Sequence, residues 1–433
     1  MTESPTKNLV LLVLSLLASA STWFYVDRIL VPYQINDAVE HSRPRGNLSD
    51  LYPRWLGARA LLLQGRDPYR PEVTREIQAG YYGRELDAHR PGDPQDQQAF
   101  AYPVYVAFLL APSVKLPFGV VQRGFNIALW VLTGASVLLW LRTLRWRPPA
   151  SVIAVFVLLM LGSIPAVQGI KLQQLSLLVA AMLAGSAALL VAGYFVPAGI
   201  LLAFATIKPQ LTWLLVLWLL VWSVNDWRRR RKFVLSFVVT MLVLLGAAEW
   251  MLPGWATEFW TAVQNYHQYT HNMSVLGWLL TPTVGNVAAA LLVMLTGFLC
   301  WPTRTAANDS AAFGSAITLV VGLTVLIVPM FAPYNQVLLL PAVMVLAREV
   351  RNLWSRGWLA RLLYGILVLV LFWPWVSSVV LMAMSFVLPP SVVQGAWKLP
   401  FFTTFTMPLI VFGLLAYGFR QISAPDDGPA SRG

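Results

Sequence analysis

The sequence is short of charged residues and contains a single cysteine. Charged side chains make up 12% of the 433 residues and hydrophobic side chains 58%, and the mean hydropathy is +0.64, which excludes a soluble globular protein. Cys300 lies in an apolar segment, so the chain has neither an intrachain disulfide nor a cysteine metal site. The Walker loop, the glycine-rich dinucleotide fingerprint, the serine hydrolase elbow and the Asp-x-Asp motif of nucleotide-sugar enzymes are also missing.

What the sequence does contain is a series of long apolar runs. Runs of roughly 17–25 residues, the length that crosses a bilayer as a helix, recur along the chain. The first run lacks a small-residue cleavage site and is expected to stay in place as a helix. We therefore predict an all-α, polytopic integral membrane protein with about 12 transmembrane helices. The predicted spans are residues 8–27, 119–143, 151–168, 171–193, 195–207, 210–224, 233–252, 282–301, 312–330, 335–347, 359–386 and 401–419.

The positive charge of the chain predicts its orientation in a cell membrane. The formal charge of +12 is concentrated in short clusters beside apolar runs, a pattern typical of cytoplasmic loops and not of nucleic-acid binding. Both termini are then cytoplasmic. Residues 28–118, 253–281 and 385–400 are then external, or periplasmic in a bacterium. The clusters are Arg142, Arg145 and Arg147; residues 228–232; and Arg348, Arg351, Arg356 and Arg361.

This orientation requires one apolar run between residues 100 and 228 not to span. We predict that residues 101–117, which contain three prolines and a lysine, form a re-entrant or interfacial segment of the first external loop. The alternative is the pair of short runs within residues 195–224. Residues 1–424 are predicted to be one membrane domain, with residues 425–433 a disordered cytoplasmic tail.

The first external loop is the most polar part of the chain. More than half of the nineteen Asp and Glu residues fall between Arg28 and Phe100, a stretch without lysine. Within it, residues 50–64 are predicted to form an amphipathic helix lying on the membrane. Asp50 at its start has two interpretations: an N-cap, or a carboxylate at the water–lipid boundary that accepts a proton from a hydroxyl. Asp37 and Glu40 are the rival carboxylates.

Several motifs of the chain resemble glycosyltransferase family 87. The first is Asp-Leu-x-x-Arg-Trp-x-x-Ala-Arg-Ala-Leu-Leu-x-x-Gly-Arg-Asp-Pro-Tyr at residues 50–69. The others are Phe-Ala-Tyr-Pro-Val at 100–104, Leu-Pro-Phe at 116–118, Gln-Gln-Leu-Ser at 173–176 and Ile-Lys-Pro-Gln at 207–210. The resemblance extends over most of residues 45–345. The chain departs from the family pattern where Gln173 replaces Gly, where Val104 replaces Pro, and where residues 332–336 carry no His.

This resemblance implies the GT-C architecture and a membrane glycosyltransferase. Such enzymes take a sugar, here mannose or another hexose or pentose, from a polyprenyl-phosphate donor and pass it to a lipid or glycan acceptor on the external face, with inversion. An acidic residue in the first external loop is the usual catalytic base, and Asp50 stands at the matching position. The expected partners are the donor, the acceptor and membrane lipids, without nucleic acid, cofactor or required metal.

Other polar residues near predicted helix ends are candidates for substrate contact. Lys208 is either a cation for the donor phosphate or a snorkelling lysine. Arg54 either binds phosphate or pairs with Asp50. Lys171 is a further candidate for phosphate, or simply polar at a membrane boundary. The residues expected to contact substrate are Tyr52, Gln173, Gln174, His267, His271 and Asn335.

The two histidines also raise the question of a metal. His267 and His271 have the spacing of a metal pair, but the sequence provides no His-Glu-x-x-His motif and no evident third ligand, so we expect no metal. An ordinary amphipathic surface is the alternative for both. For the chain as a whole, the rival functions are a transporter or flippase of lipid-linked saccharides and a non-catalytic scaffold. A transporter predicts ionisable residues in mid-membrane, which are few here apart from Glu249.

Overall fold

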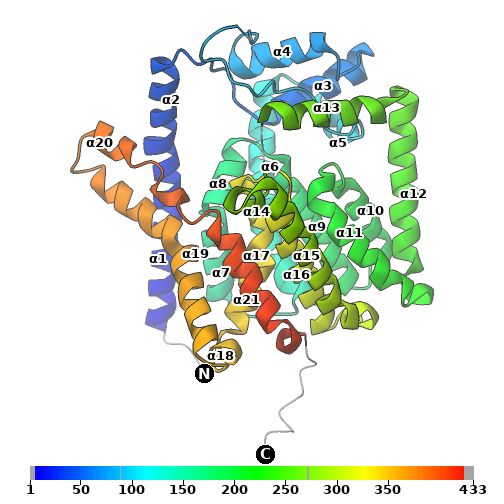
Figure 1. The fold of residues 1–433 in the computed structure, drawn as a ribbon, viewed down its shortest axis with the longest axis vertical. Coiled ribbons are helices and arrows are strands. Elements are labelled where there is room, and N and C mark those ends of the chain that lie inside the picture. Colours follow the sequence, from blue (N-terminus) through cyan, green and yellow to red (C-terminus); the bar gives the residue numbers. More distant parts are fainter. Residues whose placement is uncertain (1–4, 88, 271–272, 424–433) are drawn as a thin grey trace, which may run out of the picture.

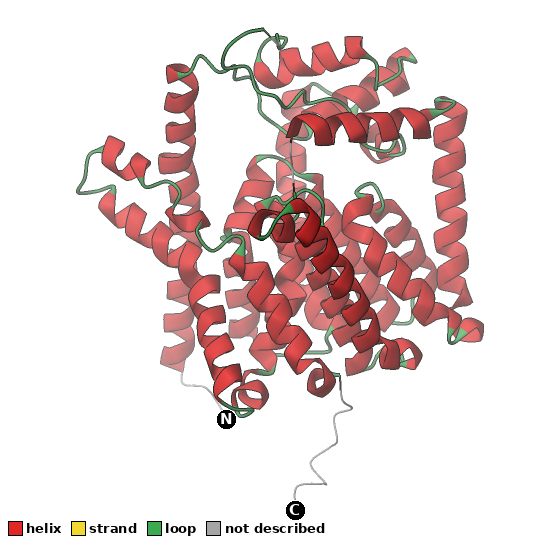
Figure 2. Ribbon diagram, in the orientation of Figure 1, coloured by secondary structure: helices red, strands yellow, loops and turns green. Residues whose placement is uncertain are grey.

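The computed structural model describes residues 5–87, 89–270 and 273–423, and every regular element in these ranges is a helix (Figures 1 and 2). The all-α prediction is therefore confirmed for the described chain. The helices in its first half are α1 Pro5–Tyr25, α2 Val31–Glu40, α3 Tyr52–Gln64, α4 Pro71–Tyr82, α5 Val106–Leu110, α6 Phe118–Thr143, α7 Ala150–Leu161, α8 Ile164–Lys171, α9 Leu175–Val191, α10 Phe195–Ala205 and α11 Pro209–Val224. Those in the second half are α12 Trp227–Met251, α13 Trp255–Thr270, α14 Val275–Leu279, α15 Pro282–Cys300, α16 Ala311–Ile327, α17 Leu340–Arg348, α18 Val350–Trp354, α19 Trp358–Met384, α20 Pro390–Gly395 and α21 Thr406–Ile422.

Membrane-length helices are fewer than the sequence predicts. Among the described residues, six helices are long and apolar enough to cross a membrane, and seven if the bent pair α7–α8 is one span. A multi-pass membrane protein is supported, but the count of 12 is not confirmed. Several predicted spans are instead shorter apolar helices of 10–17 residues, among them α9, α10, α11 and α16. The predicted span 171–193, for instance, is shortened to α9, because α8 ends at Lys171 and α9 begins only at Leu175.

Burial separates inner from outer helices. Nearly every residue of α9 and α16 is buried. In contrast, α12 and α15 leave many large apolar side chains exposed, such as Leu242 and Phe298. Exposed apolar surface of this kind marks contact with lipid or another protein. The short inner helices therefore form the centre of the bundle, and the long helices surround them.

A layer of helices covers one end of the bundle. We call α3, α4, α5 and α13 the roof (Figure 1). The helix predicted over residues 50–64 is present as α3, whose buried residues include Trp55, Ala58 and Leu61. Residues 101–117 contain only α5 and a 3-10 turn, Ala111–Ser113, neither of which is long enough to span. Their re-entrant placement in a membrane stays a prediction.

The basic clusters lie at the opposite end from the roof. The end of α6, the start of α12 and the short helix α18 all lie at that end (Figure 1). Two of the clusters are tied by the Arg348 guanidinium, which donates to the Leu144 carbonyl at 2.9 Å, and Arg145 donates to the Asp309 carbonyl at 2.7 Å. The three predicted cytoplasmic clusters are therefore at the same end of the molecule. The predicted tail, residues 425–433, lies outside the described residues.

Candidate active site

Asp50 lies under the roof, on the connection between α2 and α3. Its backbone N–H donates to the carbonyl of Leu172, at 2.8 Å, in the break between α8 and α9. Its carboxylate accepts two hydrogen bonds, one from the Tyr81 hydroxyl at 3.1 Å and one from the Gln174 amide. Helix α3 begins after Leu51 and has no side-chain cap, so the N-cap interpretation of Asp50 is wrong. The carboxylate instead joins the loop to the bundle.

A chain of polar side chains continues from Asp50 into the bundle. Lys208, only 6% exposed, lies in the break between α10 and α11, and its Nζ donates to Gln174 Oε1 at 3.1 Å and to Ser176 Oγ at 2.7 Å. Ser176 in turn donates to Asn335 Oδ1 at 2.8 Å. Because an ammonium group only donates, Lys208 holds the Gln174 amide with its oxygen inward and its NH₂ toward Asp50.

Two interrupted helices make this meeting possible. Residues 172–174 separate α8 from α9, and residues 206–208 separate α10 from α11. The connections that lead into the roof helices α3 and α5 are hydrogen-bonded to both breaks. The Asp50 N–H bonds to the first break, and the Tyr105 hydroxyl donates to the Thr206 carbonyl of the second at 2.9 Å. A continuous helix satisfies its own backbone groups, whereas these breaks leave polar groups free to face a site.

A second cation stands beside the carboxylate. The Arg54 guanidinium donates to the backbone carbonyl of Asp50 at 2.8 Å and lies 4.5 Å from the centre of the Tyr102 ring. Lys208 Nζ is 5.8 Å from the same ring and 5.5 Å from that of Tyr334. Arg54 Nε is buried and, among the described residues, has no hydrogen-bond partner. Arg54 and Lys208 therefore place two cations close to the Asp50 carboxylate, and guanidinium and ammonium groups can both bind an anion.

The surroundings of Asp50 make its carboxylate more basic than usual. Shielding from water raises its pKa, while the charges of Arg54 and Lys208 and the hydrogen bonds from Tyr81 and Gln174 act in the opposite direction. Burial also raises the pKa of Tyr81, so its hydroxyl stays protonated and continues to donate. The arrangement can therefore accept a proton at Asp50, and the two cations beside it can pair with an anion.

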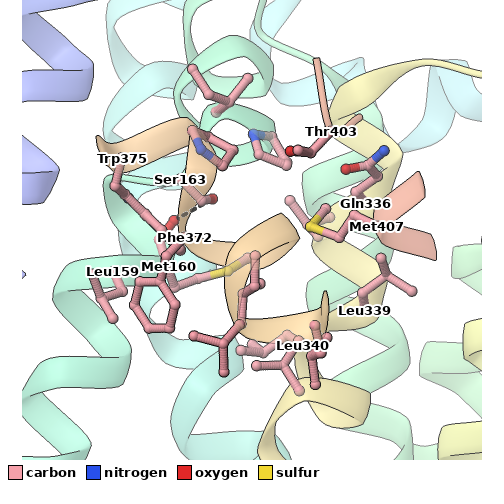
Figure 3. A pocket seen from close by; sticks show the side chains of 18 of the residues that line it. Leu159, Met160, Ser163, Gln336, Leu339, Leu340, Phe372, Trp375, Thr403 and Met407 are labelled. Carbon is pink, nitrogen blue, oxygen red and sulfur yellow. Dashed lines mark hydrogen bonds between the residues drawn. The ribbon is translucent and has the colours of Figure 1, made fainter. Parts of the chain in front are cut away.

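An apolar cavity of about 390 Å³ adjoins the 3-10 turn that carries part of this site (Figure 3). Its walls come from α7, α8, α17, α19 and α21 and from the turn Pro333–Leu339, which also holds Tyr334 and Asn335. Nearly all of the lining is hydrocarbon, for example Met160, Leu340 and Phe372. Gln336 and Thr403 are among the few polar side chains of the lining (Figure 3). Such a lining fits an apolar chain.

Comparison with known proteins identifies the family. The profile of glycosyltransferase family 87 matches residues 100–329, more than half of the chain. The chain belongs to glycosyltransferase family 87. It is therefore a glycosyltransferase with membrane helices. No curated protein and no solved structure matches it. The matched residues include Tyr102, Gln174, Ser176 and Lys208, whereas Asp50, Arg54 and Asn335 lie outside the match.

Of the residues that the sequence predicts for the site, Asp50, Arg54, Gln174, Lys208 and Asn335 lie together in this family 87 protein. Their roles are not tested by this geometry. The arrangement does rule out snorkelling for Lys208, because its ammonium group bonds to buried side chains. The rival Asp37 pairs instead with Arg43 at 2.6 Å, and Glu40 is exposed.

Two predicted contact residues next to the break, Lys171 and Gln173, bond to other parts of the chain, and their contacts with substrate stay predictions. Lys171 forms an ion pair with Asp27, at 2.5 Å, beside the π-helical turn of the first helix. Gln173 donates its amide to the carbonyls of Ile170 and Lys171, at 3.0 and 2.8 Å. Its backbone is in the left-handed region, with φ of 51°, where the family pattern has Gly. Gln173 therefore keeps the left-handed turn that glycine adopts easily, although this backbone conformation is strained for a residue with a side chain.

Tyr52 and His267, two further predicted contacts, are not among the described residues that hydrogen-bond to the Asp50 carboxylate. The ring of Tyr52 packs edge-on against Phe118, with centres 4.8 Å apart, and its hydroxyl lies where a Cβ would be at Gly80. His267 on α13 is exposed, and His271 lies outside the described residues. The described chain contains no group of three His, Cys, Asp or Glu residues able to hold a metal ion.

Sequence reasoning missed several aromatic residues of the site. Tyr81 on α4 belongs to no motif, and nothing in the sequence distinguishes it from other tyrosines. Tyr102 and Tyr334 lie within the sequence segments given above, next to Pro103 and Pro333, but the segments alone do not indicate that their rings face a cation. On α13 the prediction chose His267, but its neighbour Tyr266 is the half-buried residue, and the charges of Asp96, Arg54 and Asp50 influence its pKa, which burial raises.

Proposed function

We propose that this family 87 glycosyltransferase transfers a sugar from a polyprenyl-phosphate donor to a lipid or glycan acceptor, with inversion and with Asp50 as general base. The observation that carries the proposal is the meeting of one basic carboxylate with two cations, Arg54 and Lys208, beside the turn Pro333–Leu339, which also lines an apolar cavity. The sugar is a hexose or pentose, with mannose the first to test.

The two cations support a phosphate-linked donor. Arg54 and Lys208 lie beside the carboxylate of Asp50, and Asp96 is a further carboxylate that interacts with Arg54. A phosphodiester carries one negative charge and can pair with the two cations. Arg54 Nε, which has no partner among the described residues, supplies a donor for one of its oxygens. As the sugar departs, the lipid phosphate gains a second negative charge, and cations already in place stabilise that charge in the transition state.

The apolar cavity supports a lipid carrier on that phosphate. It shares the turn Pro333–Leu339 with Tyr334, whose ring faces the Lys208 ammonium. The tail of a lipid phosphate bound at Lys208 would then occupy the cavity of Figure 3, which this same turn lines. Its volume of about 390 Å³ holds only part of a polyprenyl chain, and the remainder lies among membrane lipids.

The chemical step needs one base and no metal or cofactor. The acceptor oxygen attacks the anomeric carbon from the face opposite the phosphate, and its proton passes to the Asp50 carboxylate. The bond between that carbon and the phosphate oxygen breaks, and its electron pair leaves with the polyprenyl phosphate. Tyr81 and Gln174 orient the carboxylate through their two hydrogen bonds, so the base is in place before the acceptor arrives.

The distribution of charge supports an external site in the cell membrane. The basic loops lie at one end of the bundle and the roof at the other (Figure 1), and basic loops stay on the cytoplasmic side. The roof and Asp50 then face the outside, where nucleotide sugars are absent and a lipid carrier is required.

The test is turnover by the purified protein in lipid. A panel of polyprenyl-phosphate sugars is supplied with a membrane lipid extract as acceptor, and release of polyprenyl phosphate is measured. We expect release with one sugar of the panel and its loss in Asp50→Asn, while Asp37→Asn behaves as the unaltered protein. Movement of the donors across the bilayer without release would support a flippase instead.

A further inference from the structure

A second cavity lies outside the Asp50 site, between the loop that follows α4 and the end of α13. Its volume is about 370 Å³, within the range of small-ligand sites. Unlike the cavity of Figure 3, it is lined in nearly equal parts by polar and apolar surface. The polar side chains that matter for the argument are Asp87, Arg90, Gln95, Gln97, Gln268 and Tyr269.

The loop side of this cavity is held in shape by hydrogen bonds. Arg84 forms an ion pair with Asp93, which also accepts from the Asp87 N–H at 2.9 Å. Gln78 on α4 donates to the carbonyl and to the side-chain oxygen of Gln97, at 3.1 and 2.9 Å. The cavity is therefore built on α4 and is not a chance opening in a loose loop.

The lining suits a neutral ligand rich in hydroxyl groups. Asp87 and Arg90 carry opposite charges, so the cavity has no strong preference for an anion or a cation. Gln95 and Gln268 offer amides that both donate and accept, as hydroxyl groups do. The Tyr269 ring supplies an apolar face for the C–H groups of a sugar ring.

Tyr269 itself carries the most direct sign of a ligand. Its hydroxyl is buried and, among the described residues, has no hydrogen-bond partner. A buried hydroxyl without a partner is costly, and a bound hydroxyl group in the cavity removes that cost.

The cavity is linked to the Asp50 site through α4. Gln78 bonds to the lining residue Gln97, and Tyr81, three residues further along the helix, donates to Asp50. On α13, Tyr266 packs edge-on against the lining residue Tyr269, with ring centres 5.5 Å apart. A ligand in the cavity therefore lies against the roof, whose helix α4 also reaches Asp50.

We propose that this cavity binds one sugar unit of the acceptor, so that the acceptor is a saccharide or glycolipid with at least two sugar units. One unit presents its hydroxyl to Asp50, and another occupies the space between Gln95, Gln268 and Tyr269. The proposal rests on the proposed function of the Asp50 site and names the class of its acceptor.

The first experiment identifies the product. The active donor, labelled in its sugar, is incubated with the protein in lipid and a membrane lipid extract, and the labelled product is analysed by mass spectrometry. We expect a glycan of at least three sugars, two from the acceptor and one transferred. A product with only one or two sugars would overturn the proposal but leave the glycosyltransferase function intact. Absence of donor turnover would refute the proposed function itself.

The second experiment tests the cavity directly. Tyr269→Phe removes only the partnerless hydroxyl, so the protein should be at least as stable as before, yet the acceptor KM should rise about tenfold. Gln268→Ala should also raise it. Hydrolysis of the donor in the absence of acceptor should not change, because neither residue lies at the donor phosphate. Gln264→Ala, an exposed residue one turn earlier on α13, is the matched control.

A third measurement does not depend on turnover. Saturation-transfer NMR with mannotriose, maltotriose and chitotriose detects weak binding to the protein in lipid discs. We expect one of these probes to bind and Tyr269→Phe to reduce its signal. Equal signals in Tyr269→Phe and Gln264→Ala, or an unchanged acceptor KM in Tyr269→Phe, would contradict the proposal.

Discussion

Replacing Asp50 by Asn removes a charge and a base from the site with little change in shape. The carboxylate accepts from Tyr81 and Gln174, and the Gln174 amide cannot turn because Lys208 holds its oxygen. An Asn side chain can still satisfy both neighbours: its oxygen accepts from Gln174, and its NH₂ donates to the Tyr81 hydroxyl, which both donates and accepts. Since Asp50 caps no helix, α3 loses nothing. We therefore expect the thermal stability and the donor affinity of Asp50→Asn to remain near those of the unaltered protein.

Turnover should respond very differently. An amide does not accept the acceptor's proton, and the loss of a positioned base lowers kcat by about 10²–10⁴-fold. The assay is release of polyprenyl phosphate at saturating donor, alongside donor binding and thermal unfolding. Asp37→Asn is the control, because Asp37 is paired with Arg43 in the neighbouring loop. Near-normal kcat in a folded Asp50→Asn protein would refute the general-base role of Asp50 and make Asp37 and Glu40 the next candidates for the base.

Three further predictions follow from the same geometry. Lys208→Met should raise the donor KM by about 10–100-fold, since hydrogen bonds to charged groups contribute roughly 1.5–3 kcal/mol. Lys208→Arg should retain part of the donor affinity, and unchanged donor binding in Lys208→Met would contradict a phosphate contact. The pH profile of kcat/KM should have an acidic limb above the ordinary Asp pKa of 3.8, because Asp50 must be ionised to act and its pKa is raised; a limb at or below 3.8 would count against Asp50. In a Cys300→Ala background, cysteine at the exposed position Gln264 should react with an impermeant thiol reagent from outside and cysteine at exposed Ser355 should not; external labelling at 355 would reverse the orientation.

Much of the fold class follows from composition and local pattern. Apolar runs with few charges predict helices in a membrane, because a backbone without water must satisfy its own hydrogen bonds. Basic clusters beside those runs predict an orientation, and the position of Asp50 before an amphipathic stretch predicts the start of α3 within two residues. These are properties of neighbouring residues, so sequence alone reaches them.

The breaks inside the bundle depend on tertiary packing. Hydropathy starts this run at residue 171, since two glutamines change its average little, yet the chain turns at Gln173 and α9 begins only at Leu175. The turn is supported by distant partners: Gln122 donates to the Gln173 side chain at 3.1 Å, and the Asp50 N–H donates to the Leu172 carbonyl. No local signal contains those contacts, so the sequence placed the start of this run too early.

The hydrogen-bond partner of each polar side chain likewise depends on the tertiary structure. The sequence determined that Asp50, Lys208 and Asn335 are polar residues near the ends of apolar runs. Only the fold decided that Ser176 and Gln174 join them into one chain, while Lys171, next to the same break, turns to Asp27. The physical reason is that a buried charge takes whichever partner the packing brings within reach, and residues far apart in the sequence supply those partners.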